Sequence, residues 1–204
     1  MGFYEDQILP RVIDVMLGNA AMGKLRRRAM EGLSGTVVEI GFGSGTNVPY
    51  YPPEVERVLA VDPATTGRKM AAKRLAASTV PVEFVGLTGE SLPLEDASVD
   101  NVLSTWTLCT IPGIDAALGE IRRVLKPGGH LFFLEHGLAE DPKVAGRQQR
   151  FDRLQGRIAG GCHLNRDHTA LIGASGLEVD RVANFFIAGP KPLSYMYAGT
   201  AVKV

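Results

Sequence analysis

The sequence has few cysteines, no excess of charge and no long hydrophobic run. Its 204 residues include only Cys109 and Cys162, without a CxxC pair, so neither a disulfide framework nor a zinc-binding signature is indicated. The 22 basic and 22 acidic residues balance, which argues against a nucleic-acid binder held by general positive charge. No stretch approaches the ~18 apolar residues of a membrane span, and the start has no signal-peptide core. These absences favour a cytoplasmic protein with no metal and no transmembrane segment.

Short apolar runs alternate with helical stretches along the middle of the chain. Strands are expected over 36–40, 58–62, 82–85, 99–104 and 130–135, and helices over 5–21, 22–33, 65–77 and 116–125. Nearly continuous apolar strands separated by helices indicate a parallel sheet that is covered on both faces. Towards the end, 177–182 and 195–204 predict an antiparallel hairpin. The expected fold is α/β and Rossmann-like, with a mostly parallel seven-stranded sheet.

The chain shows no repeat, low-complexity tract or long linker, so we expect a single domain over 1–204. Within it, 1–34 forms N-terminal helices, 35–136 the central sheet, 137–176 a helical segment and 177–204 the last strands. The first helix and the segment 137–176 are expected to cap the ends of the strands.

A glycine-rich string, Glu39-Ile40-Gly41-Phe42-Gly43-Ser44-Gly45, directly follows the first strand. Glycine allows positive φ and leaves the backbone bare, so that a ligand can lie against it. Asp62 stands at the end of the next strand, where a carboxylate can accept two hydrogen bonds from a ribose diol. The two features together indicate an adenosine-type cofactor at the carboxyl ends of the strands.

The spacing of the string distinguishes between cofactors. A dinucleotide fingerprint reads GxGxxG, but Thr46 stands at the third glycine position. Pro49, Pro52 and Pro53 follow, so a long pyrophosphate-binding helix cannot start cleanly there. S-adenosylmethionine carries no phosphate and does not need that helix. It is therefore favoured over NAD(P) and over a glycine turn without a ligand.

Several segments resemble the conserved blocks of class I methyltransferases. Residues 39–45 resemble motif I and 61–63 motif II, while 89–100 and 122–129 are similar to blocks of the ubiquinone/menaquinone-type enzymes. Residues 135–136, 161–166 and 195–203 resemble the small methyltransferase-like proteins known in mammals as alkyl thiol methyltransferases. The resemblance implies the class I methyltransferase fold, methyltransferase activity, S-adenosyl-L-methionine as cofactor and S-adenosyl-L-homocysteine as product. Those mammalian relatives carry an N-terminal membrane anchor, and no such anchor is expected here.

The resemblance also implies which residues bind the cofactor. Glu39 and the loop glycines would line its methionine end, Asp62 would hold the ribose, and Ser104 with Thr105 would lie near the methionine amino group. The full implied set is Glu39, Gly41, Gly43, Gly45, Asn47, Asp62, Pro63, Gly89, Glu90, Ser104 and Thr105.

Five further residues are candidates for the acceptor side. His136 follows the fifth strand, where it would act as a base or orienting group, or would simply end the strand with a hydrogen bond. Trp106 and Cys109 are expected to form an apolar pocket wall. Cys162 precedes His163, but methyl transfer needs no covalent intermediate, which disfavours a nucleophile pair. Arg166 would bind a polar acceptor or form a structural salt bridge with Glu135 or Asp167.

The expected activity is methyl transfer to a small, largely apolar acceptor, with a thiol favoured by resemblance. The alternatives are a quinone-, aromatic- or phospholipid-modifying methyltransferase and a non-catalytic domain that only binds S-adenosylmethionine. Nucleic-acid base methylation is disfavoured, because Ser104-Thr105-Trp106-Thr107 stands where an Asn/Asp-Pro-Pro-Tyr/Phe string would be.

One helical segment suggests a contact with a surface. Lys143, Arg147, Arg150 and Arg157 share a helix face beside Val144, Phe151 and Ile158. This face is either solvated or makes a weak contact with an anionic membrane surface or partner.

Overall fold

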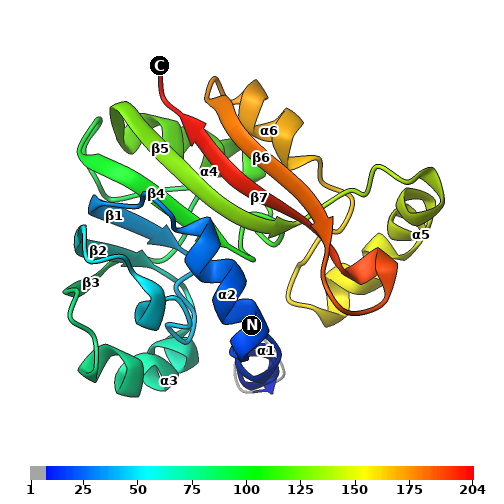
Figure 1. Ribbon diagram of the computed structural model, residues 1–204, viewed down its shortest axis with the longest axis horizontal. Helices are drawn as coiled ribbons and strands as arrows, with labels where there is room; N and C mark the ends of the chain where they lie inside the picture. The colour runs from blue at the N-terminus through cyan, green and yellow to red at the C-terminus, as the bar shows by residue number, and fades with distance from the viewer. Residues whose placement is uncertain (1–7) are drawn as a thin grey trace.

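The computed structural model describes residues 8–204, which form one seven-stranded sheet flanked by helices (Figure 1). The strands are β1 (Gly35–Ile40), β2 (Val55–Val61), β3 (Val82–Gly86), β4 (Val99–Thr105), β5 (Leu125–His136), β6 (Glu178–Phe186) and β7 (Tyr195–Val202). Their spatial order is β3-β2-β1-β4-β5-β7-β6; β1 to β5 pair in parallel, and β7 is antiparallel to both β5 and β6. The predicted fold class is confirmed.

The described residues form six α-helices and two short 3-10 helices. They are α1 (Leu9–Leu17), α2 (Ala20–Ala29), α3 (Thr65–Ala76), α4 (Ile114–Val124), α5 (Pro142–Ile158), α6 (His168–Ala174), η2 (Val48–Tyr50) and η3 (Lys191–Leu193). Between residues 8 and 204, none of the helices has both the length and the apolar character needed to cross a membrane.

The sheet is buried on both faces at its centre, as its continuous apolar strands predicted. Successive side chains of a strand point to opposite faces. Phe133 of β5 accordingly belongs to the same buried cluster as Ile121 of α4, whereas its neighbour Leu134 packs with Ala29 of α2. The core of the molecule is therefore two layers, one on each side of β4 and β5.

The N-terminal helices differ from the prediction. The helix expected over 5–21 ends at Leu17, and its part before residue 8 lies outside the described residues. Asn19 causes the break, because its side chain accepts hydrogen bonds from Ala21 N–H (3.0 Å) and Met22 N–H (3.2 Å) and so caps the next helix. That helix, α2, ends at Ala29 rather than at residue 33.

Two strands are longer than predicted. β5 begins at Leu125, so residues 126–129, which the prediction left between the helix 116–125 and the strand 130–135, lie inside it. Gly128 has a φ of +78°, and the pairing with β4 shifts register between Val99 and Asn101. These residues therefore form an irregular start of the strand. β6 likewise continues to Phe186, beyond the predicted 177–182.

The cap expected from the first helix and from the segment after β5 stays a prediction. That segment forms two helices, α5 and α6, and Figure 1 shows α5 beside the connection between β6 and β7. Buried Gln148 fixes α5 there, because its side chain bonds to the backbone of Gly137, Ala139 and Pro192 at 2.9–3.1 Å. At the other side, Asp14 of α1 accepts a hydrogen bond from the Ser44 hydroxyl at 2.5 Å.

Candidate functional site

The carboxyl ends of β1, β2, β4 and β5 meet at one edge of the sheet, and the predicted loop leaves β1 at this edge. Gly41, Gly43 and Gly45 have φ values of +76°, +54° and +73°, which confirms the expectation of positive φ. A Cβ at Gly43 would point into open space, with no atom nearer than 3.9 Å. The loop therefore presents a bare backbone face against which a ligand can lie.

Asp62 lies directly beside this loop. Its carboxylate accepts hydrogen bonds from the N–H groups of Gly43 and Ala64, both at 2.7 Å. Burial raises the pKa of Asp62 above its ordinary value, although both N–H groups oppose the shift. Because each carboxylate oxygen accepts more than one hydrogen bond, this side chain is also able to hold a diol. The structure thus brings together the loop and the acid that the sequence singled out, and both fit an adenosyl group.

A buried polar network lies beneath the loop. Glu39 accepts hydrogen bonds from Tyr51 Oη (2.5 Å) and Asn47 Nδ2 (3.0 Å), and Arg26 donates to Asn47 Oδ1 (2.6 Å) and Thr105 Oγ1 (3.0 Å). Burial raises the pKa of Glu39 to about 7, with the bonds to Tyr51 and Asn47 opposing it, and burial lowers the pKa of Arg26 to about 10. Three predicted residues, Glu39, Asn47 and Thr105, are therefore held by one network.

Arg26 was not predicted as a site residue, although the sequence carried a signal for it. It is one of several basic residues in the second helix, but it lies four residues after Met22 and three before Ala29. This is the spacing of a helix face turned to the core, and Arg26 is only 3% exposed there. A charged residue at a core-facing position of a helix indicates a buried polar partner, which here is Asn47.

The residues predicted near the adenine differ in how far they are exposed. Pro63 is exposed, and Gly89 is buried so tightly that a Cβ there would lie 3.0 Å from Ile40. Glu90 is half-buried and accepts a hydrogen bond from Gly113 N–H at 3.3 Å, which leaves one of its oxygens without a bond to the backbone. Their contacts with the cofactor stay predictions.

A second buried carboxylate, that of Glu135, organises the end of β4. It is fully buried and accepts hydrogen bonds from Ser104 Oγ (2.7 Å), Thr107 N–H (3.1 Å) and Cys109 N–H (3.2 Å). The predicted residue Ser104 thus directs its hydroxyl towards Glu135. Thr107 in turn lies against the glycine loop, because a Cβ at Gly41 would come within 1.9 Å of its Oγ1.

The acceptor candidates converge on the same edge. Cys162 Sγ lies 3.7 Å from Cys109 Sγ and 3.9 Å from His136 Nδ1, and both cysteines are free and buried. The hydrogen bond between the two sulfurs lowers the pKa of Cys162 to about 6 against the effect of burial, and the same contact raises the pKa of Cys109 well above its usual range. His163 turns away and pairs with Asp152 at 2.9 Å.

Trp106 packs in a buried apolar cluster, and its role as a pocket wall stays a prediction. It is 8% exposed, packs with Met196, and lies under the Arg26 guanidinium, 4.6 Å from its carbon to the ring centre. Its φ of +52° places it in the left-handed region, and its indole Nε1 has no hydrogen-bond partner within residues 8–204. A strained residue with an unpartnered buried donor is typical of a ligand site.

Arg166 forms hydrogen bonds with the backbone of the loop after β4. Its guanidinium donates to the carbonyl oxygens of Leu108 and, at 2.7 Å, of Ile111, rather than pairing with Glu135 or Asp167. It therefore ties the segment between α5 and α6 to the loop after β4.

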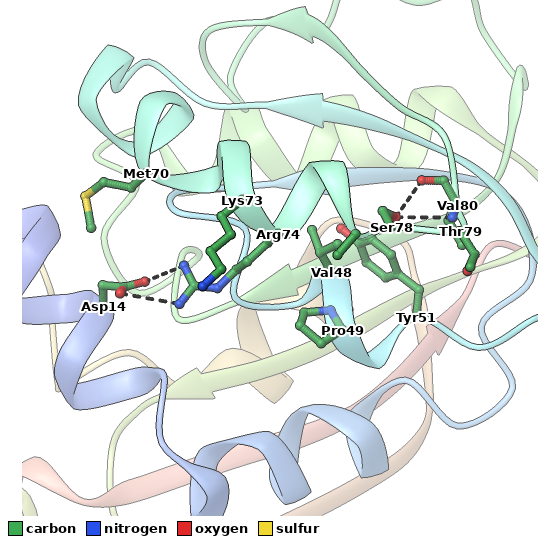
Figure 2. A pocket seen from close by; sticks show the side chains of 11 residues that line it. Asp14, Val48, Pro49, Tyr51, Met70, Lys73, Arg74, Ser78, Thr79 and Val80 are labelled. Atoms are coloured by element: carbon green, nitrogen blue, oxygen red, sulfur yellow. Dashed lines mark hydrogen bonds and ion pairs between the residues drawn. The ribbon is translucent and has the colours of Figure 1, made fainter.

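A cavity of about 730 Å³ lies between α1, η2 and α3 (Figure 2). The Asp14–Arg74 ion pair (2.8 Å) lines it, and so does Tyr51, which links it to the buried network. None of the predicted site residues lines this cavity. It adjoins the glycine loop through Ser44, whose carbonyl accepts from Arg74 at 2.9 Å, but it is separate from the bare face at Gly43.

Comparison with known proteins agrees with this geometry. Residues 38–133 match the family described as methyltransferase domain. A human protein named thiol S-methyltransferase TMT1B is 38% identical over 146 residues, which cover 69% of this chain and 59% of that protein. The ubiquinone/menaquinone biosynthesis C-methyltransferase UbiE of Brucella anthropi is 43% identical over 76 residues, 37% of this chain and 28% of that protein.

A similar fold occurs in solved structures. A SAM-dependent methyltransferase from Thermotoga maritima superposes with a TM-score of 0.68 at 22% identity, and the match covers 98% of both chains. The chain spans less than two thirds of the length of the thiol methyltransferases that it matches.

The substitution Glu39→Gln should remove a pH-dependent loss of stability. The pKa of Glu39 is raised from 4.5 to about 7 in the folded chain, so between these values the folded state binds more protons than the unfolded state. Stability contributed by Glu39 therefore falls as the pH rises through this window. We expect the unfolding free energy of the wild type, relative to E39Q, to decrease by about 1–3 kcal/mol between about pH 5 and pH 8.

Urea unfolding at the two pH values measures this difference. The exposed Glu83→Gln variant is the control and should show no such change. A wild-type to E39Q difference that is the same at both pH values contradicts the prediction.

Proposed function

Because the chain contains a class I methyltransferase domain, whose cofactor is S-adenosylmethionine, we propose that it transfers a methyl group to a small, largely apolar thiol. The observation that supports S-adenosylmethionine as the cofactor is the bare backbone at Gly43 beside the Asp62 carboxylate. The thiol part is supported by the relatives named thiol S-methyltransferase and by the sulfur-rich, largely apolar surroundings of His136.

The residues of the glycine loop and its neighbours would hold the cofactor. The bare backbone of the loop would lie against the adenosyl group, the carboxylate of Asp62 would accept hydrogen bonds from its ribose, and the network of Glu39 and Asn47 would lie near its methionine end. When bound, S-adenosylmethionine supplies a methyl group on a positively charged sulfur. The buried carboxyl groups of Glu39 and Glu135 lie in this region, and a cationic ligand would favour their charged form.

The chain's own contribution to the reaction is mainly orientation. Methyl transfer from a sulfonium is an in-line displacement, and holding two reactants in line is worth roughly 7–11 kcal/mol. A thiol loses its proton near pH 8.5, about the reference pKa of a cysteine, so modest electrostatic help is sufficient. His136, half-buried at the end of β5, would orient the acceptor.

Three alternatives differ in acceptor or in turnover. A quinone or aromatic acceptor follows from the match to UbiE, a phospholipid acceptor would need a pocket open to a chain, and a degenerate domain would bind the cofactor without transfer. The same loop and Asp62 serve all of them, so only an acceptor assay separates them.

The substitution Asp62→Asn should weaken cofactor binding without unfolding the protein. The change removes the charged acceptor for a ribose diol, and hydrogen bonds to charged groups contribute about 1.5–3 kcal/mol each. We expect the Kd for S-adenosylhomocysteine, measured by calorimetry, to rise on the order of 10–100-fold. Asp96→Asn, at a side chain that is 80% exposed, is the matched control. A D62N variant that binds within twofold of the wild type would show that this carboxylate does not hold the ribose.

The acceptor class is tested by incubating the protein with methyl-labelled S-adenosylmethionine and a panel of alkyl thiols, phenols and quinols. We expect label in the thioether products of the thiols alone. Transfer only to phenols or quinols would favour the alternative acceptors, and binding without transfer would favour the non-catalytic domain. Either result would refute the proposed acceptor.

We also propose that α5 contacts an anionic membrane surface. Phe151, Leu154 and Ile158 are 51–56% exposed along one stripe of the helix. Beside the stripe lie four exposed cations, Lys143, Arg147, Arg150 and Arg157. Val144 does not belong to the exposed stripe as the sequence suggested, because it is 4% exposed and packs in the core. Exposed apolar residues flanked by cations fit the headgroup region of anionic lipids.

Flotation with vesicles tests this contact. At low salt the protein should float with vesicles containing phosphatidylserine, and the double variant R150E/R157E should remain in the bottom fraction, because each surface cation contributes about 1 kcal/mol. Vesicles of neutral lipid are the control. A wild-type protein that stays in the bottom fraction with anionic vesicles contradicts the contact. The cytoplasmic location predicted from the sequence stays a prediction.

A further inference from the structure

Cys109, His136 and Cys162 come together from three separate segments of the chain. They follow β4, end β5 and follow α5, respectively, and their ligand atoms all lie within 4.8 Å of one another. Two sulfurs that bind the same tetrahedral Zn²⁺ are about 3.8 Å apart, and a sulfur and an imidazole nitrogen about 3.6 Å. The observed separations are 3.7 Å between the sulfurs and 3.9 Å from Cys162 Sγ to His136 Nδ1. Two sides of the triangle therefore already have nearly the size of a zinc site, and the third, between Cys109 and His136, is no longer than 4.8 Å.

Each ligand is held by the backbone around it. The N–H of Cys109 donates to the buried carboxylate of Glu135 at 3.2 Å, and the carbonyl of Cys109 accepts from His163 N–H at 2.8 Å. The carbonyl of His136 bonds to His168 Nε2 at 2.8 Å. These contacts fix the three segments relative to one another before any ion binds, which is what a metal site needs.

The residue types match a particular class of ion. Two thiol sulfurs and one imidazole nitrogen are soft ligands, which suit Zn²⁺ among the abundant divalent cations and do not suit Mg²⁺ or Ca²⁺. Within residues 8–204, the cluster offers three ligands and no fourth. Three protein ligands are the arrangement of catalytic zinc sites, where the fourth position takes water or substrate.

We propose that Cys109, His136 and Cys162 bind one Zn²⁺ whose fourth position takes the sulfur of the methyl acceptor. The position fits, because Cys109 follows Thr107 by two residues and Thr107 lies against Gly41 of the cofactor loop. The metal and the bare face of the loop therefore share one edge of the sheet.

The role of the fourth position rests on the proposed function. An acceptor thiol that binds the ion releases its proton to water, and the resulting thiolate forms a carbon–sulfur bond to the methyl carbon of the cofactor. The bond between that carbon and the sulfonium sulfur breaks, and its electron pair remains on this sulfur, which becomes the neutral thioether of S-adenosylhomocysteine. The methylated acceptor is a neutral thioether, a weaker zinc ligand than a thiolate, so water displaces it.

Metal analysis of the whole reduced chain tests the site without any cofactor or acceptor. After incubation with Zn²⁺ and removal of the excess, we expect about one zinc per chain. The variants C109S, C162S and H136N should each lose at least about 90% of it, because each removes one of three ligands. His163→Asn is the matched control and should keep its zinc, since His163 pairs with Asp152 outside the cluster. Less than a tenth of an equivalent of zinc on folded, reduced wild type overturns the site.

Cobalt substitution of the wild type keeps the test independent of how the variants fold. Co²⁺ in the site should give sulfur-to-metal charge-transfer absorption, and addition of an alkyl thiol should shift its visible bands. Bound cobalt without charge-transfer absorption, or a fully reduced chain that takes up no cobalt, refutes the zinc site. Bands that do not respond to thiol refute the role of the fourth position alone.

The two proposals fail separately. If the protein methylates thiols but binds no zinc, the metal site is wrong and the proposed function stands. If it binds zinc with no methyl transfer to any thiol, the acceptor is wrong and the ligand set stands. Loss of thiol methylation on chelation, with the Kd for S-adenosylhomocysteine unchanged, supports both.

Discussion

The fully buried carboxylate of Glu135 determines how the chain leaves β4, and both halves of the site depend on it. By accepting from Ser104 Oγ and from the N–H groups of Thr107 and Cys109, it folds the loop back onto the end of β5. One turn of chain then presents Thr107 to the glycine loop and Cys109 to the sulfur cluster. A buried carboxylate is costly to desolvate unless several donors meet it, and the three donors here offset that cost.

The features that the sequence predicted correctly are those that depend on residues close together in the chain. The glycine loop, Asp62 at a strand end and the alternation of strands and helices each follow from neighbours in sequence, and the structure confirms them. Helix ends were less predictable, because the cap at Asn19 overrides the apolar periodicity that runs through it. Arg26 carried a signal in its helical spacing, but the convergence of Cys109 with Cys162 was beyond reach. The two cysteines are 53 positions apart in the sequence, and tertiary contacts such as the hydrogen bond from His163 N–H to the Cys109 carbonyl bring their segments together.

The network beneath the loop shows why such a site is held by polar groups at all. Desolvation is the largest cause of the pKa shift of both Glu39 and Arg26, and it disfavours the charge of each. Hydrophobic residues of similar volume would stabilise this region at least as well. They would not, however, fix Asn47, whose amide oxygen accepts from Arg26 and whose amide nitrogen donates to Glu39 and Thr105. The arrangement therefore fixes the position of one polar side chain beneath the glycine loop at a cost in stability.

The chemistry of sulfur connects the proposed thiol acceptor with the proposed zinc site. A zinc ion bound by two thiolates and an imidazole carries little net charge, so it binds a thiolate through soft bonding rather than through charge. An oxygen acceptor such as a phenol gains less from such an ion and would still need a base for its proton, whose pKa is near 10. The same ligand set that fits zinc thus favours a sulfur acceptor over a quinol. This selectivity would come from the three residues around the acceptor and not from the cofactor loop, which all class I methyltransferase folds share in outline.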